Sequence, residues 1–241
     1  MKGWWPFQQP AGPLLLLPRV TLIGVPYPDW AGPCHVSVEF GPSRMISMAT
    51  VILAAYAIGS IPFAFLLARR WGAADLRRVG SGNLGAANVM RASGITAGVT
   101  VAVLDLAKGA VSVWVAERLS AHPAAPAVAG LAAIVGHVYP IWLRFRGGKG
   151  VATACGVFSV LTPLAVPPAL GLFIVTVWLT KYVSLGSVLA SVALPPIAYA
   201  LGSPGPVVLA AGAAAGIIVF RHRSNLSRLR MHTERRIGAR A

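Results

Sequence analysis

The sequence predicts an all-α, polytopic membrane protein with about seven transmembrane helices. Of its 241 residues, 56% are hydrophobic and only 11% are charged, whereas soluble domains carry about 25% charged residues. The mean hydropathy is +0.70. Long apolar runs alternate with short polar segments, most of which are basic. These three observations exclude an ordinary soluble globular domain.

The first 44 residues differ from the rest of the chain. They are rich in proline and contain scattered tryptophans, and the apolar run Leu14–Leu17 is too short to span a bilayer. We expect residues 1–44 to form a poorly ordered N-terminal extension, which an upstream start codon would explain if Met45 or Met48 were the natural start. Residues 45–241 are then the transmembrane domain.

Apolar runs dominate the sequence from residue 47 onward, and each predicts a membrane helix. The runs cover residues 47–68, 94–117, 127–143, 151–163, 166–180, 185–201 and 206–220. Pro62 is expected to kink the first helix, which membrane proteins tolerate. Several runs are shorter than the roughly 20 residues of a straight span. Seven spans are therefore the favoured count, with six or eight as alternatives.

Basic residues are concentrated in alternate connecting segments. Five Lys or Arg residues lie in 69–91, three in 144–149, one at Lys181 and seven in 221–240, whereas the intervening segments hold only Arg118. By the positive-inside bias, the N-terminus is outside, the C-terminus is cytoplasmic, and all four basic segments share the cytoplasmic face. In so hydrophobic a chain, the net charge of +15 favours lipid headgroups or phosphates over nucleic acid as partners.

The stretch from Gly80 to Arg91 is small, polar and glycine-rich within an otherwise apolar chain. Glycines let backbone N–H groups approach an anion, and the arginine adds a cationic fork suited to phosphate. Its candidate phosphate ligands are Ser81, Gly82, Asn83, Gly85, Asn88 and Arg91. We expect a phosphate cradle at the membrane surface; a flexible loop between two helices is the alternative.

A second glycine-rich segment leads directly into the fourth apolar run. Gly147, Gly148, Lys149 and Gly150 resemble half of a P-loop, in which backbone donors and a lysine precede a helix N-terminus. The segment lacks the spacer and the Ser or Thr of a complete motif, so ATP hydrolysis is excluded. Phosphate binding remains the prediction, with a tight basic turn as the alternative.

Other polar residues are weaker signals. Asp105 and Lys108 are three apart on a predicted helix and share a face, which marks either structural support or substrate contact. His137 is an isolated histidine in or near the membrane and is expected to be supporting.

Two further segments lie near predicted helix ends. Lys181, Ser184 and Ser187 offer a cation and two hydroxyls at the start of the sixth run. His222 and Asn225 are also three apart, but a positively charged stop after the last run is the favoured interpretation from these residues alone.

Taken together, four motifs in this order resemble the bacterial acyl-phosphate-dependent glycerol-3-phosphate acyltransferases. They lie at 81–91, 136–153, 181–187 and 222–229, and the resemblance covers about residues 48–238. It implies a seven-helix inner-membrane protein with a cytoplasmic active site and no metal or other cofactor. Such an enzyme moves a fatty acyl group from acyl phosphate to the 1-hydroxyl of glycerol 3-phosphate. Ala87 stands where many members have Thr.

The resemblance also implies roles for individual residues. The essential residues of the family fall on Ser81, Arg91, Lys149, His222 and Asn225. The residues expected to bind substrate phosphate are Gly82, Asn83, Gly85, Asn88, Gly147, Gly148, Gly150, Lys181, Ser184 and Ser187. Asp105, Lys108 and His137 are expected to be supporting residues.

The expected chemistry needs no protein nucleophile, because phosphate is already a good leaving group. Catalysis would rest on positioning and electrostatic stabilisation, and the proton acceptor is either His222 or a substrate phosphate oxygen. A membrane transporter of organic phosphates is the alternative function. Transporters commonly show internal repeats and a site at the membrane midplane, whereas here the motifs gather on one predicted face and no repeat is evident.

Overall fold

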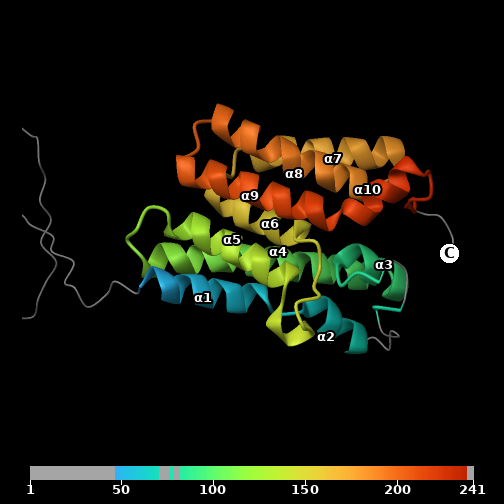
Figure 1. Ribbon diagram of the computed structural model, residues 1–241, viewed down its shortest axis with the longest axis horizontal. Coiled ribbons are helices and arrows are strands. Elements are labelled where there is room, and N and C mark those ends of the chain that lie inside the picture. The colour runs from blue at the N-terminus through green and yellow to red at the C-terminus, as the bar shows by residue number, and fades with distance from the viewer. Residues whose placement is uncertain (1–46, 71–75, 79–81, 238–241) are drawn as a thin grey trace, which may run out of the picture. The chain divides into compact units, whose positions relative to one another are not determined.

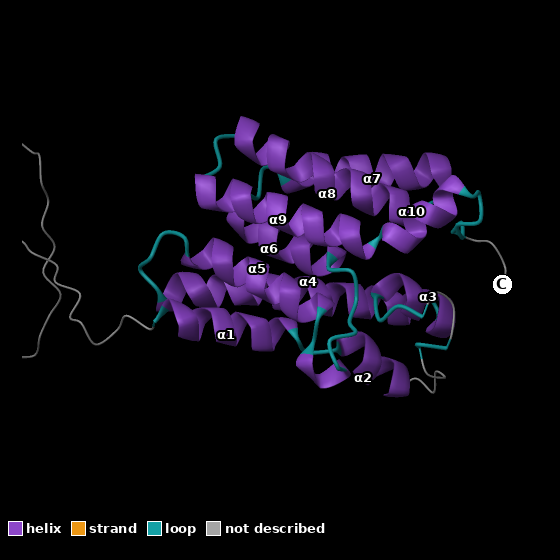
Figure 2. Ribbon diagram, viewed as in Figure 1, coloured by secondary structure: helices purple, strands orange, loops and turns teal. Residues whose placement is uncertain are grey.

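The computed structural model describes residues 47–70, 76–78 and 82–237. The predictions for residues 1–44 and for Ser81 therefore fall outside the described part of the chain. Within that part all regular structure is helical and no strand is present, as Figure 2 shows. The fold class expected from composition is confirmed to this extent.

The first apolar run forms two helices, α1 (Met48–Gly59) and α2 (Phe63–Arg70), interrupted before Pro62. Proline lacks a backbone N–H and clashes with the preceding turn, so the break falls where the sequence predicts a kink. The carbonyl of Ile61, left outside the helical ladder, accepts a hydrogen bond from Nζ of Lys108 at 2.9 Å. A buried charged group thus satisfies the backbone at the break.

The next helices are α3 (Ala86–Ser93), α4 (Ile95–Leu119) and α5 (Ala125–Val138). Gly94 separates α3 from α4 with φ of 91°, a backbone conformation that favours glycine. A short 3-10 turn, η2 (Ile141–Leu143), follows α5.

The C-terminal half contains α6 (Val151–Leu161), α7 (Val166–Thr180), α8 (Val183–Ala200), α9 (Gly205–Arg221) and α10 (Arg223–Arg230). The axes of α9 and α10 differ by 56° at a break at His222. Every predicted apolar run is therefore helical.

Helix length separates these helices into two groups. Four spans, Met48–Ala68, Ile95–Leu119, Ala125–Leu143 and Val183–Ala200, are long and apolar enough to cross a membrane, and the bent pair α9–α10 makes a fifth. The helices α6 and α7 are apolar but shorter.

Small residues bring the central helices close together. A Cβ on Gly109 of α4 would lie 2.2 Å from the carbonyl oxygen of Thr153, and one on Gly156 of α6 would lie 1.9 Å from that of Leu106. Only glycine fits at either position, so the backbones of α4 and α6 pack directly against each other. Elsewhere α1 packs on α5, and α8 packs between α7 and α9.

The bundle ends differ in chemistry. The helices α3 and α10 lie at one end of the bundle, next to the N-terminus of α8 and the C-terminus of α9 (Figure 1). The basic, glycine-containing motifs occupy these segments and the loop between η2 and α6. The fold thus brings segments far apart in sequence close together.

Candidate active site

A cavity of about 620 Å³ opens among α3, α4, α6, α7, α8 and α9. The four motif segments all contribute to its wall. The predicted catalytic and substrate-binding residues that line it are Asn83, Gly85, Asn88, Arg91, Lys149, Gly150, Ser184, Ser187, His222 and Asn225. Arg91, Lys149 and His222, which are widely separated in sequence, therefore face one cavity.

The rest of the wall is apolar and comes from the interiors of the helices. It includes Leu106 of α4, Phe158 of α6, Phe173 of α7, and Ala211 and Ile218 of α9. Along α9 the wall extends from Ala211 to His222, which at 1.5 Å per residue is about 16 Å. The cavity therefore joins a polar, cationic end to a long apolar section.

Lys149 lies at the start of α6, where unpaired backbone N–H groups also favour an anion. Its Nζ donates a hydrogen bond to Oδ1 of Asn225 at 2.5 Å. Burial, together with the nearby cations Arg228, Arg91 and Arg221, lowers the pKa of the Lys149 ammonium to about 8, against the opposing effect of Glu234. An anionic ligand beside Lys149 would stabilise the protonated ammonium and so offset part of this lowering of the pKa.

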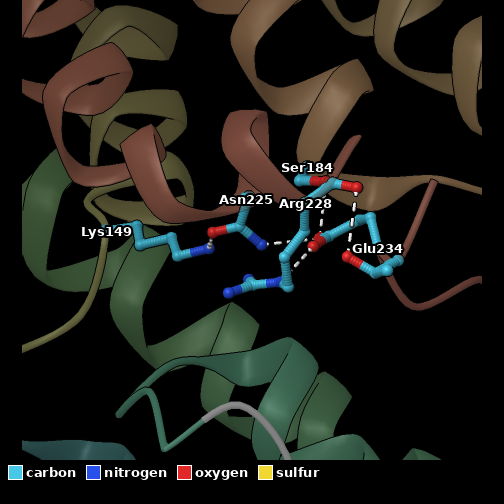
Figure 3. A network of polar contacts seen from close by, with 6 residues as sticks. Lys149, Ser184, Asn225, Arg228 and Glu234 are labelled. Carbon is cyan, nitrogen blue, oxygen red and sulfur yellow. Dashed lines mark hydrogen bonds and ion pairs between the residues drawn. The ribbon is translucent and has the colours of Figure 1, made fainter. Parts of the chain in front are cut away.

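Glu234, in the segment after α10, is the centre of a polar network drawn in Figure 3. Its Oε1 accepts hydrogen bonds from Ser184 Oγ at 2.8 Å and Asn225 Nδ2 at 2.6 Å, and its Oε2 pairs with Nε of Arg228 at 2.7 Å. Burial alone would raise the pKa of this carboxyl, but these donors hold it below its ordinary value. Because Nδ2 of Asn225 faces Glu234, its Oδ1 faces Lys149.

His222 is buried at the break between α9 and α10, with Nδ1 2.7 Å from the carbonyl oxygen of Ile218. A carbonyl only accepts, so Nδ1 carries the proton and donates it. In the neutral ring, the lone pair on Nε2 is then available to accept a hydrogen bond from a ligand hydroxyl.

The first motif forms a turn and the start of α3. Gly82 has φ of 68°, and Gly85 is the residue preceding the helix. Nδ2 of Asn88 donates to the carbonyl of Leu76 at 3.0 Å, so this side chain also ties the loop to the helix. Burial, and then the charge of Arg235, lowers the pKa of Arg91.

Gly147 and Gly148 have a different role from the one expected. Their N–H groups donate to the carbonyls of Val138 and His137 at 3.0 and 3.1 Å, and neither residue lines the large cavity. A Cβ would lie 2.1 Å from the His137 carbonyl oxygen at the first position and 2.1 Å from His137 Nε2 at the second. These two glycines therefore permit close packing, and the free amides lie further along, at the start of α6.

The expectation of substrate contact for Lys181 is not supported. Its side chain is exposed and outside the cavity wall. The residue ends α7 with φ of 64°, and its carbonyl accepts a hydrogen bond from the backbone N–H of Ile237 at 2.8 Å. Lys181 thus closes a turn and holds the C-terminal segment.

Asp105 and Lys108, which were predicted to share a helix face, form an ion pair on α4. Nζ of Lys108 is 2.8 Å from Oδ1 of Asp105, and Nδ1 of His137 is 3.5 Å from the same oxygen. All three side chains are buried. Asp105 and His137 reach the cavity wall, whereas Lys108 is directed to the α1–α2 break.

Sequence reasoning missed several charged residues. Arg228, Glu234 and Arg235 line the cavity, and Arg221 donates to the loop carbonyls of Gly147 and Gly148. One signal was available, because Glu234 is the single acidic residue in a tail that carries seven arginines.

Comparison with known proteins identifies the family. A family model described as glycerol-3-phosphate acyltransferase matches residues 49–232. A glycerol-3-phosphate acyltransferase of Geobacter sulfurreducens is 46% identical over 195 residues, which are 81% of this chain and 100% of that protein. A protein of the same name from Syntrophotalea carbinolica is 43% identical over 196 residues, with the same two shares.

Solved structures agree with this assignment. The crystal structure of PlsY (YgiH), an integral membrane glycerol 3-phosphate acyltransferase, in its glycerol 3-phosphate form has a TM-score of 0.76 at 36% identity, covering 80% of this chain and 96% of that one. The lysophosphatidic acid form has a TM-score of 0.74 at 34% identity, with the same coverage. This membrane protein therefore belongs to the glycerol-3-phosphate acyltransferase family.

Proposed function

We propose that the chain transfers a fatty acyl group from acyl phosphate to the sn-1 hydroxyl of glycerol 3-phosphate, giving lysophosphatidic acid and phosphate. Membership of an acyltransferase family favours this enzyme over a transporter of organic phosphates. The related solved structures are named for their glycerol 3-phosphate and lysophosphatidic acid forms, which are the acceptor and the product of this reaction.

The shape and chemistry of the cavity support this proposed reaction. A fatty acyl phosphate has an anionic head and a long apolar tail, and the cavity has a cationic end and an apolar section of about 16 Å along α9. Burial of the tail among alanine, phenylalanine and leucine side chains is favourable for each methylene group. The cations at the other end compensate the charge of two phosphorylated substrates.

We assign the phosphate groups to the cations that face the cavity. Lys149 and the N-terminus of α6 form one anion site, and Arg91 with the start of α3 forms another. His222 and Asn225 then orient the glycerol moiety through hydrogen bonds. Ser81 completes the first motif in this proposal, and Ser81→Ala is expected to lower turnover.

The chemical step requires no residue to be covalently modified. The sn-1 hydroxyl oxygen attacks the acyl carbon, and the new ester bond forms as the bond from that carbon to the phosphate oxygen breaks. Phosphate leaves with the bonding electrons, and the nearby cations stabilise its charge. A substrate phosphate oxygen takes the proton of the sn-1 hydroxyl, while Nε2 of His222 accepts a hydrogen bond from the sn-2 hydroxyl and so orients the glycerol moiety.

We also propose the arrangement in the membrane. The helices of the seven apolar runs are seven spans of a bacterial inner membrane, with α6 and α7 as the short ones. The concentration of arginines in the motif segments supports a cytoplasmic location for them, by the positive-inside bias. The N-terminus is then outside and the C-terminus inside.

A donor comparison tests this function. Purified protein in detergent is given labelled glycerol 3-phosphate with palmitoyl phosphate, palmitoyl-CoA or palmitoyl acyl carrier protein, without added metal. The proposal expects lysophosphatidic acid from the acyl phosphate alone. Product formed only from the thioesters would contradict the donor assignment. With the protein reconstituted in vesicles, uptake of glycerol 3-phosphate without product would favour the transporter.

A further inference from the structure

The loop before α6 is tied to the end of α9 by a single arginine. Nε of Arg221 donates to the carbonyl of Gly148 and its Nη2 donates to that of Gly147, both at 3.2 Å. The guanidinium also lies over the ring of Tyr139, 5.7 Å from its centre. The planar fork of arginine suits two adjacent carbonyls in a way that a lysine ammonium does not.

These contacts complete the hydrogen bonding of the two glycines. Their N–H groups already donate to the end of α5, at His137 and Val138. With Arg221 on the carbonyl side, all four backbone groups of Gly147 and Gly148 are paired. The backbone of the two glycines is therefore held in one position, and both of their carbonyl groups point at the guanidinium of Arg221.

The position of Arg221 couples two parts of the site. It is the last residue of α9 and directly precedes His222, while the loop that it holds directly precedes Lys149. Asn225, on the α10 side of the break, in turn accepts a hydrogen bond from Lys149. A shift of α9 would therefore move the loop and its lysine together.

We propose that Arg221 is a positioning residue for the transfer reaction: by bridging the Gly147 and Gly148 carbonyls, it sets Lys149 against His222 and Asn225. It does not line the cavity and is not assigned contact with substrate. This inference rests on the function proposed above, because its readout is acyl transfer.

The test compares Arg221→Lys with Arg223→Lys. Arg223 is two residues away, is exposed, and interacts with the carbonyl and ring of Phe220 outside the site, so it is a matched control. Arg221→Lys is expected to lower kcat/KM for glycerol 3-phosphate roughly 10- to 100-fold, because small misplacement of a binding group has that effect. Arg223→Lys is expected to match the wild type.

Hydrogen exchange separates positioning from general loss of structure. In Arg221→Lys, the amides of residues 147–149 are expected to exchange faster, while exchange in α4 and α8 and the melting temperature stay at the wild-type level. For Arg221→Ala, added guanidinium chloride at millimolar concentration is expected to restore part of the rate and the protection of the loop. The same salt should not restore Lys149→Ala.

Different results would contradict the proposed function and the positioning role of Arg221. An inactive wild-type protein would contradict the proposed function. An active wild type with an unaffected Arg221→Lys variant would overturn the positioning role, as would faster exchange spread through the bundle. If the Lys, Gln and Ala variants at position 221 all fail to fold, the positioning role is also overturned, because Arg221 would then be a structural residue only.

Discussion

Lys149 has a charge that depends on its surroundings. Burial among cations lowers its pKa to about 8, so the ammonium is protonated below that pH and neutral above it. Its proposed role is to bind substrate phosphate, which requires the protonated form. Activity at alkaline pH therefore reports on this residue.

We predict that kcat/KM for glycerol 3-phosphate falls as the pH rises through about 8, approaching a tenfold loss per pH unit. Lys149→Arg keeps its charge at all these pH values, so it should lose this fall while retaining part of the activity. Initial rates from pH 6 to 10 measure both. Lys181→Arg is the control, and a wild-type profile that stays flat to pH 10 would contradict the assignment.

Glu234 balances the cations of the site and fixes the amide of Asn225. We predict that Glu234→Ala destabilises the protein by on the order of 2 kcal/mol, because it leaves Arg228 and Asn225 without their acceptor. Glu234→Gln keeps a carbonyl acceptor and should lose less. Thermal unfolding in detergent compares them, and an alanine variant as stable as the wild type would refute this role.

The sequence identified candidate site residues that stand within a short recognisable motif. Arg91 and Lys149 were found because each stands in a compact, unusual stretch, whereas His222 and Asn225 were identified only through the family resemblance. All four line the cavity. Their catalytic and binding roles stay predictions. Arg221 was passed over as part of a basic stop, because its partners are the carbonyls of a loop more than 70 residues away. A hydrogen bond to a backbone carbonyl leaves no pattern in the side chains of either segment.

At the scale of helices, apolar runs were sufficient to place the main elements. The break at Pro62 was also predicted, because proline acts locally. The helix α3 was not predicted, since it has no long apolar run and most of it lies within a stretch expected to be a cradle or loop. Its helical state depends on packing of Val89 and on the ties that Asn88 makes to Leu76.

The close contact of α4 and α6 leaves no room for a side chain larger than glycine at position 156. Gly156→Ala should separate the two helices, because the added carbon would lie 1.9 Å from the carbonyl oxygen of Leu106. We expect lower thermal stability and reduced turnover, since α6 begins beside Lys149. Gly212→Ala on α9 is the control: its surroundings are open, and alanine favours helix by about 1 kcal/mol over glycine. Equal stability of the two variants would contradict direct backbone packing.

For the whole molecule, we predict that the cavity determines which acyl chains fit. Ala214 of α9 faces the cavity, whereas its neighbour Ala213 is exposed outside it. We predict that Ala214→Leu shifts the preference toward shorter acyl phosphates, because the larger side chain fills part of the apolar section. Ala213→Leu should leave the preference unchanged. Competition between acyl phosphates of different length measures this, and identical preferences in both variants would place the acyl chain elsewhere.

The joining of distant motifs into one site is a property of the entire fold. The sequence predicted a shared face from the distribution of charge, and the four motif segments all line one cavity, with α3 and α10 at one end of the bundle (Figure 1). The volume of the cavity and the course of its apolar section could not be predicted, because they depend on how α4, α6, α7, α8 and α9 pack.

A crystal structure with a non-hydrolysable acyl phosphonate is the most direct measurement of whether one cavity holds both ends of the donor. We predict that the phosphonate lies among Lys149, Arg91 and the N-terminus of α6, with the acyl chain running beside α9 toward Ala211. A headgroup bound away from these cations, or a chain lying outside the cavity, would contradict it.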